Sequence, residues 1–277
     1  MTWKTILLSA DAGEDCDRRT ELACDLAAAF GARLVGLAGS APMPLPMGDP
    51  YTGGAMMGEA LDLFRGLADA EVKAAQGAFR AIATAYRLET EWRGRAGWPA
   101  DMIAREARVA DVVVVGRRSP LAPARAADPA DVLLAIGRPI LVVPPQPPRD
   151  PLGTPAVVAW TDSRETQRAV AAALPLLLRA SFVSVVAVSQ GAATSEADQK
   201  AVADVAGWLR QHGIEATPTV RPSRGEVASE IMAAAEDIAA GLIVAGGYGH
   251  ARLREAVLGG VTQKLLADAP VCLLLSH

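Results

Sequence analysis

Short apolar runs alternate with amphipathic stretches along the whole chain. The runs at 6–8, 112–115 and 242–244 contain no polar residue, which is typical of strands buried on both faces of a parallel sheet. Apolar positions at helical spacing predict helices over the segments between such runs, namely 18–30, 59–86, 164–178 and 196–212. This alternation predicts an α/β fold in which helices cover both faces of a parallel sheet.

The same order of elements occurs twice, which indicates a tandem duplication. Four segments of the first copy (6–11, 33–37, 111–116 and 137–143) have counterparts in the second (157–162, 183–188, 241–246 and 269–275). Each copy is expected to hold five strands and about four helices, joined by right-handed crossovers. A proline-rich, semi-rigid linker over 144–151 separates the copies. We therefore predict one domain over residues 1–148 and a second over 149–277.

A glycine-rich loop in the second copy is the main candidate for a functional site. It follows the apolar run at 242–244, precedes a predicted helix, and has the spacing Gly246-x2-Gly249-x9-Gly259-Gly260. Glycines let a ligand approach the backbone closely, and the unpaired amides at a helix start attract anions. The loop therefore predicts a site for a negatively charged group.

This spacing differs from the common phosphate-binding motifs. No Lys-Ser or Lys-Thr pair follows a glycine, as a P-loop requires, and Arg252 stands where G-x-G-x-x-G needs its third glycine. The spacing instead resembles the loop of the universal stress protein family, whose ATP-binding members carry G-x2-G-x9-G followed by Ser or Thr. Gly260 departs from that pattern, because the family usually places a hydroxyl there for the phosphates.

The resemblance covers nearly the whole chain, twice, and implies a Rossmann-like sheet of strand order 3-2-1-4-5 in each copy. It also implies that the second copy binds ATP or a related adenine nucleotide, with or without Mg. The residues that it assigns to this site are Thr161, Val188, Ala245, Gly246, Gly249, His250, Arg252, Gly259, Gly260, Val261 and Thr262.

Some of these residues have a simpler explanation. His250 is equally well explained as an exposed loop histidine, and Thr262 as a helix cap. Val188 and Ala245 would be ordinary core residues in the absence of a pocket. Trp160, next to the site, could flank an adenine ring, although a strand tryptophan more often packs in a core or an interface.

The first copy lacks the glycine-rich loop. It keeps Gly116, but three prolines within 120–129 each remove an amide donor. Its Asp11 matches the family's aspartate at the end of the first strand, which contacts the adenine or ribose, whereas the second copy has Thr161 there. Neither copy carries the complete set, and we expect the first copy to be structural, with Asp11 as its one candidate site residue.

Composition and charge narrow the class of protein. The net charge is −4, and the arginines are scattered among acids, which argues against nucleic acid as a partner. We expect no signal peptide and no membrane span, because no apolar run approaches the roughly 20 residues that a span needs. Three cysteines without metal-ligand spacing predict reduced thiols, no metal site and a cytoplasmic location.

The leading hypothesis is a cytoplasmic stress-response regulator in which nucleotide binding is coupled to conformation. No serine lies in G-x-S-x-G and no histidine completes a triad, so we assign no catalytic residue and expect at most weak ATPase activity. The alternative is a dimeric interaction scaffold with a vestigial pocket. The resemblance further implies that the apolar edge strands at 140–143 and 271–275 pair the copies into a pseudo-dimer, and that chains form homodimers.

Overall fold

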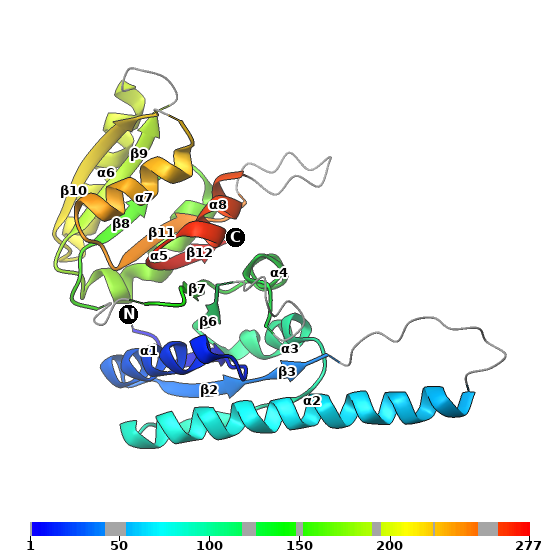
Figure 1. Ribbon diagram of the computed structural model, residues 1–277. Helices are drawn as coiled ribbons and strands as arrows, with labels where there is room; N and C mark the ends of the chain where they lie inside the picture. The colour runs from blue at the N-terminus through cyan, green and yellow to red at the C-terminus, as the bar shows by residue number, and fades with distance from the viewer. Residues whose placement is uncertain are drawn as a thin grey trace.

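The computed structural model describes residues 2–41, 54–117, 126–147, 152–189, 195–223, 225–248 and 260–277. The chain forms two α/β halves joined through a shared sheet (Figure 1). The first half contains β1 (Thr5–Ser9), α1 (Glu14–Phe30), β2 (Arg33–Leu37), β3 (Gly39–Ser40), α2 (Gly54–Ala83), β4 (Thr90–Trp92), β5 (Arg95–Ala96), α3 (Pro99–Glu106), β6 (Val112–Gly116), α4 (Pro129–Ala135) and β7 (Ile140–Val143). Short 3-10 helices at Thr84–Tyr86 and Ala107–Val109 follow α2 and α3.

The second half repeats this order without the small strands. It contains β8 (Ala156–Ala159), α5 (Arg164–Leu177), β9 (Val183–Ser189), α6 (Glu196–Gln211), β10 (Ala216–Pro222), α7 (Val227–Asp237), β11 (Leu242–Gly246), α8 (Gly260–Asp268) and β12 (Cys272–Ser276). The predicted repeat is therefore confirmed, with five main strands and four α-helices in the described part of each half.

Ten strands form one sheet in the order β10-β9-β8-β11-β12-β7-β6-β1-β2-β4. Within each half the pairing is parallel and the order is 3-2-1-4-5, as expected. The two halves meet at β7 and β12, which pair antiparallel and align Leu141 with Leu274. This confirms that the apolar edge strands pair the two copies, and neither edge is left open to other chains.

Helices cover both faces of the sheet, and each face has its own apolar core. One core is built with α1, α2, α5 and α6, and the other with α3, α4, α7 and α8. Both cores include strand residues from both halves, so the hydrophobic interior is continuous across the seam. Polar contacts cross the same seam: Arg117 donates to the Ala269 carbonyl at 3.2 Å, and Arg179 donates to the Ala29 carbonyl at 2.6 Å.

Three local features differ from the sequence predictions. Helices α1 and α2 begin earlier than predicted, at Glu14 and Gly54, and α2 extends past the end of the sheet (Figure 1). The two-residue strands β3 and β5 form a small extra sheet that the apolar pattern did not indicate. Strand β10 contains Pro218 and Pro222, which a sheet tolerates because β10 lies at its edge.

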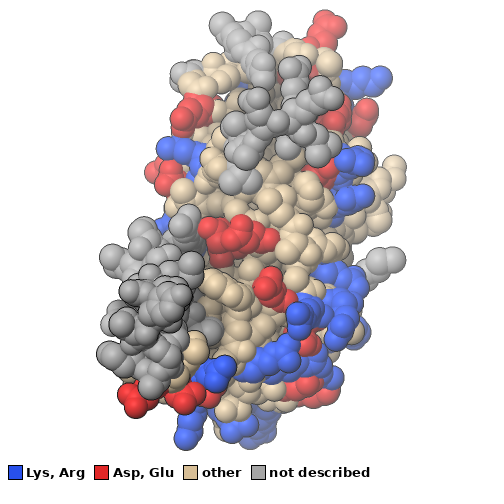
Figure 2. Space-filling view, turned by 90° about the vertical axis from the view of Figure 1, so that its right-hand side faces the viewer, with Lys and Arg blue, Asp and Glu red and all other residues tan. Residues whose placement is uncertain are grey.

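Charged side chains of both signs are distributed over the surface. Figure 2 shows them on the face that is on the right of Figure 1, where basic side chains gather over the first half and are interleaved with acidic ones. Across the described ranges, no helix combines the length and the hydropathy that crossing a bilayer requires.

Candidate functional site

A cavity of about 290 Å³ opens at the carboxyl edge of the second half of the sheet. It lies where β8, β9 and β11 end and where α5 and α8 begin, which is where open α/β sheets usually bind ligands. The sequence-predicted residues that line it are Thr161, Val188, Ala245, Gly246, Gly260, Val261 and Thr262. The structure therefore brings these seven residues together around one cavity. Gly249, His250, Arg252 and Gly259 lie outside the described residues.

Hydroxyl groups at the start of α5 form one wall of the cavity. The Thr166 hydroxyl lies 3.0 Å from the Thr161 hydroxyl and 3.1 Å from the Ser163 hydroxyl. Ser163 also caps α5 by accepting a hydrogen bond from the Thr166 amide. A Cβ added to Gly246 would lie 2.6 Å from the Thr166 amide nitrogen. Only glycine fits here, and its small size lets the helix start close above the strand end.

The opposite wall is the start of α8. Gly260 is the first residue of that helix, and a Cβ added there would meet no atom of the described residues within 4 Å. Thr262 lies in the first turn, where its buried hydroxyl accepts a hydrogen bond from the Tyr248 amide at 3.2 Å. This hydroxyl therefore links the two chain segments that border the cavity.

Tyr248 connects the cavity wall to the first half of the chain. Its backbone is in the left-handed region, with φ of 58°, and its side chain is 5% exposed. Burial raises the pKa of its phenol, and the carboxylates of Asp128 and Asp131 near α4 raise it further. The preceding Gly247 abuts Leu133 of α4, because a Cβ on Gly247 would lie 2.5 Å from the Leu133 side chain. Helix α4 thus supports the segment that leaves β11.

The chemistry of the described lining is apolar and hydroxylic. Val186 and Val188 from β9, with Val227 and Ile231 from α7, offer aliphatic contacts, and no described lining residue carries a charge. The amino-terminal ends of α5 and α8 therefore give this part of the cavity a positive electrostatic character. Such a cavity suits a ligand that has a flat apolar portion and an anionic one. Within the described ranges, no group of three His, Cys, Asp or Glu side chains could hold a metal ion.

Comparison with known proteins agrees with the duplicated fold. The model of the universal stress protein family matches residues 2–134 and again 154–277. The chain belongs to the universal stress protein family. A search of curated proteins found no match.

Solved structures of family members share the architecture of this universal stress protein over its full length. A universal stress protein from Archaeoglobus fulgidus DSM 4304 superimposes with a TM-score of 0.72 at 18% identity, covering 99% of this chain and 96% of that one. A putative universal stress protein from Pseudomonas aeruginosa UCBPP-PA14 gives a TM-score of 0.58 at 13% identity, covering 98% and 92%. At these identities the likeness supports the fold, including the tandem arrangement.

The matching position in the first copy of this universal stress protein is filled by its own side chains. Asp11 accepts a hydrogen bond from the Arg19 guanidinium at 2.5 Å and another from the Gly13 amide at 2.8 Å. Arg19 is 5% exposed and also donates to the Ser9 carbonyl. Its guanidinium lies so close above Gly116 that a Cβ there would be 2.0 Å from Nη1. Within the described residues, the hollow beside Asp11 has a volume of about 20 Å³.

Sequence reasoning missed several residues of the second-copy cavity. Ser163 and Thr166 could have been found as a Ser-x-x-Thr helix start after the first strand, but this pattern serves capping in most helices. Tyr248 has no distinguishing signal beyond its place between two glycines. Trp160 lines this cavity and also a second one between α5 and α6, so it is positioned to flank a bound ligand.

Proposed function

We propose that this universal stress protein is a regulator that binds one adenine nucleotide in the cavity of its second half. The observation that carries the proposal is the convergence of Thr161, Val188 and Gly246 with the start of α8 around one cavity. Its volume of about 290 Å³ is near the lower end of the ~300–1,000 Å³ range of small-molecule sites. The aliphatic side chains would contact the base, and the amides of α8 would contact phosphate oxygens.

Nucleotide binding would act through conformation and not through a reaction. The described lining offers hydroxyls but no carboxylate, histidine or amine that could serve as a general base. A nucleotide held by both α5 and α8 would tie the two walls together, and it would favour the conformations in which both walls reach it. We propose a cytoplasmic location for this regulator, because adenine nucleotides are available there.

The number of nucleotides bound per chain tells whether one copy or both copies bind. Because the Arg19–Asp11 ion pair occupies the matching place in the first half, we expect one nucleotide for each chain. Isothermal titration with ATP, ADP and AMP, each with and without Mg²⁺, measures this ratio. Acid extraction of freshly purified protein shows whether a nucleotide is already bound.

A pair of matched variants tests the location of the site. Val188→Phe places a ring into the cavity from the end of β9, and Ala12→Phe places the same ring in the exposed bend between β1 and α1, beside the first-copy hollow. Val188→Phe should weaken binding at least tenfold, and Ala12→Phe should leave it unchanged. Equal affinities in both variants, or two nucleotides per chain, would contradict the assignment.

The second candidate function is an interaction scaffold that no longer binds nucleotide. The specific observation in its favour is Gly260, which removes the hydroxyl expected at the start of α8. No described residue would obstruct a side chain at Gly260, so substitutions there test this candidate. If Gly260→Ser binds ATP and both the wild type and Gly260→Ala do not, the cavity is vestigial and the scaffold function is favoured.

A further inference from the structure

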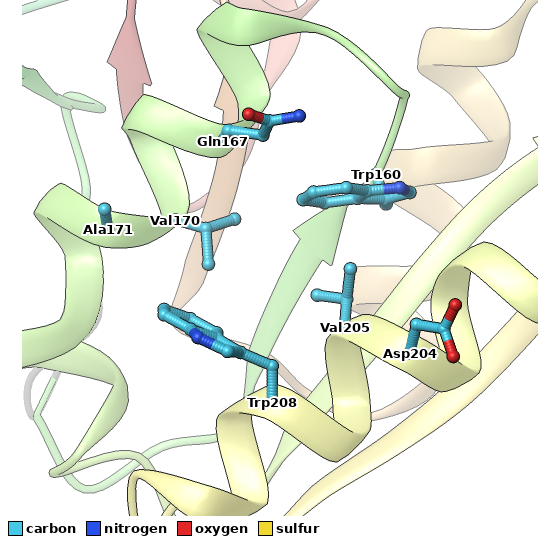
Figure 3. A pocket seen from close by; sticks show the side chains of 7 residues that line it. All are labelled: Trp160, Gln167, Val170, Ala171, Asp204, Val205 and Trp208. Carbon is cyan, nitrogen blue, oxygen red and sulfur yellow. The ribbon is translucent and has the colours of Figure 1, made fainter.

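A second cavity, of about 340 Å³, lies between α5 and α6 on the outer side of the second half (Figure 3). Val170 and Ala171 of α5 and Val205 of α6 form its side walls. Trp160, just after β8, and Trp208, on α6, place an indole ring at either end, and the valine side chains lie between the two rings. The cavity is therefore a slot with aliphatic sides and aromatic ends.

The matching place in the first half is closed. There the helices α1 and α2 pack directly against each other, whereas the slot separates α5 from α6. The strand register explains the difference at one end. The amide of Ala10 bonds the Leu37 carbonyl just as the amide of Trp160 bonds the Val186 carbonyl, so the first copy has a methyl group where the second has an indole. The slot is therefore a feature of the second copy and not of the repeated fold.

The surface of the slot selects an uncharged ligand. Polar groups contribute almost nothing to that surface, although Gln167 and Asp204 are among the residues that line it. Figure 3 shows the Asp204 carboxylate directed away from the space between the two rings. A charged group placed in this space would lose its hydration without gaining a partner, which is costly. An apolar group would gain free energy by leaving water.

The dimensions of the slot restrict its ligand to a small molecule. The lining runs from Gln167 to Ala171 on α5 and from Asp204 to Trp208 on α6, so at 1.5 Å per residue each wall is roughly 6 Å long. A stable interface with another chain buries about 800 Å² on each partner, which so short a slot cannot supply. Its volume instead lies within the ~300–1,000 Å³ range of small-molecule sites.

Both indole rings are held in place from outside the slot. The Trp160 Nε1 donates a hydrogen bond to the Asp162 carboxylate at 3.1 Å. The Trp208 ring lies edge-on to the His212 ring, with centroids 4.4 Å apart. Flat aromatic molecules stack on indole faces, and rings that are already positioned lose little freedom when a ligand inserts between them. Trp208 remains 39% exposed, so such a ligand would cover apolar surface that the fold leaves in contact with water.

We propose that the slot between α5 and α6 is a second ligand site, which binds a small, uncharged, flat aromatic molecule between Trp160 and Trp208. The apolar surface disfavours a charged ligand, the short walls exclude a partner chain, and the two fixed rings favour a flat molecule. Trp160 borders both this slot and the cavity of the proposed nucleotide site, but the proposal does not depend on nucleotide binding.

Titration calorimetry of the full-length protein with 2-naphthol tests the chemical class of the ligand. We expect saturable one-to-one binding. 2-Naphthoate, which is equally flat but charged, should bind about tenfold more weakly or worse, because its carboxylate would be buried without a partner. 1-Adamantanol, an uncharged alcohol with a round carbon cage, should bind about fivefold more weakly or worse, because it cannot stack on the rings.

Variants locate the site. Val205→Phe, which fills the slot from α6, and Trp208→Ala, which removes one ring, should each weaken 2-naphthol binding about tenfold or more. Ala203→Phe, at an exposed position of α6 outside the slot, is the matched control for the added ring and should bind like the wild type. Asp204→Asn should also bind like the wild type, because the carboxylate faces away from the slot.

Nuclear magnetic resonance of the indole N–H groups gives a second readout of the location. Addition of 2-naphthol should shift the signals of Trp160 and Trp208, which line the slot. The signals of Trp3, Trp92 and Trp98, which lie in the first half, should not move. Trp208→Ala should leave ATP affinity unchanged, because Trp208 does not line the nucleotide cavity.

Several results would overturn the proposal: absence of saturable 2-naphthol binding, equal binding by the wild type and Val205→Phe, or equal affinities for 2-naphthol and 2-naphthoate. A wild-type dimer in sedimentation that Trp208→Ala converts to a monomer would also overturn it, because the slot would then be an interface between copies of the chain. Absence of ATP binding with retained 2-naphthol binding would contradict the proposed function and leave this site standing.

Discussion

Substitution of Gly246 by alanine tests how closely α5 abuts the end of β11. The added Cβ would lie 2.6 Å from the Thr166 amide nitrogen and from the Thr166 hydroxyl, and 3.0 Å from the Glu165 carbonyl carbon. Two of these atoms belong to the backbone of a helix, so a side-chain rotation cannot relieve the overlap. The first turn of α5 would have to move away from the sheet.

The expected magnitude follows from two opposing terms. Overpacking at a rigid contact costs about 1–3 kcal/mol, and replacing glycine by alanine returns roughly 0.4–1 kcal/mol through the unfolded chain. The net loss of about 1–2 kcal/mol corresponds to a melting temperature about 3–6 °C lower, at roughly 2–4 °C per kcal/mol for chains of this size. ATP affinity should fall as well, because Thr161 and Thr166 share a hydrogen bond at this contact.

Thermal unfolding followed by circular dichroism measures the effect, and Gly260→Ala provides the control. An added Cβ at Gly260 meets no atom within 4 Å in the part of the chain that the structure describes, so this variant should melt at or slightly above the wild-type temperature. If both variants melt at the same temperature, α5 does not press on the strand end, and our account of the cavity wall is refuted.

Three further predictions concern the site and the core. Thr161→Asp should raise adenosine affinity about fivefold, or ~1 kcal/mol, by supplying a charge-assisted hydrogen bond. Calorimetry measures this affinity, with Thr161→Asn as the control that lacks the charge. Equal adenosine affinities of Thr161→Asp and the wild type would contradict the prediction. Burial raises the pKa values of Cys24 and Cys272 to about 12, so iodoacetamide at pH 8 should modify them only after unfolding; rapid labelling of the folded protein would show that these thiols are accessible. The pKa of buried Glu165 is lowered, chiefly by a hydrogen bond from its own backbone amide. The ionised carboxylate therefore contributes to stability above the ordinary pKa of 4.5, and this contribution is lost as the pH falls through the lowered pKa. The difference in melting temperature between the wild type and Glu165→Gln should shrink in acid, and a difference that does not change with pH would rule this contribution out.

The sequence was sufficient to predict the architecture because the fold depends on the order and spacing of apolar segments along the chain. Apolar runs such as 112–115 and 242–244 become central strands in any parallel sheet with helices on both faces. Their recurrence in the same order predicts two similar halves. Strand β10 carried a weaker signal, since Pro218 and Pro222 normally argue against a strand and are accepted here only because β10 is an edge.

The site could be predicted only in part because side-chain contacts depend on distances between elements. The spacing of glycines and the family resemblance indicated Gly246 and Thr262, which line the cavity. Arg19 covers Gly116 and binds Asp11 because α1 lies close to β6. This distance between the two elements cannot be read from the sequence.

The antiparallel pairing of β7 with β12 has a consequence for how this chain can evolve. In a dimer of identical chains, any substitution appears at both symmetry-related sites at once. Here the two halves are encoded separately within one polypeptide, so the first half can fill its site with the Arg19 side chain while the second half keeps an open cavity. The β7–β12 pairing keeps the two halves together while their sequences diverge. The two halves can therefore take different functions, which two identical chains in a symmetric dimer cannot do.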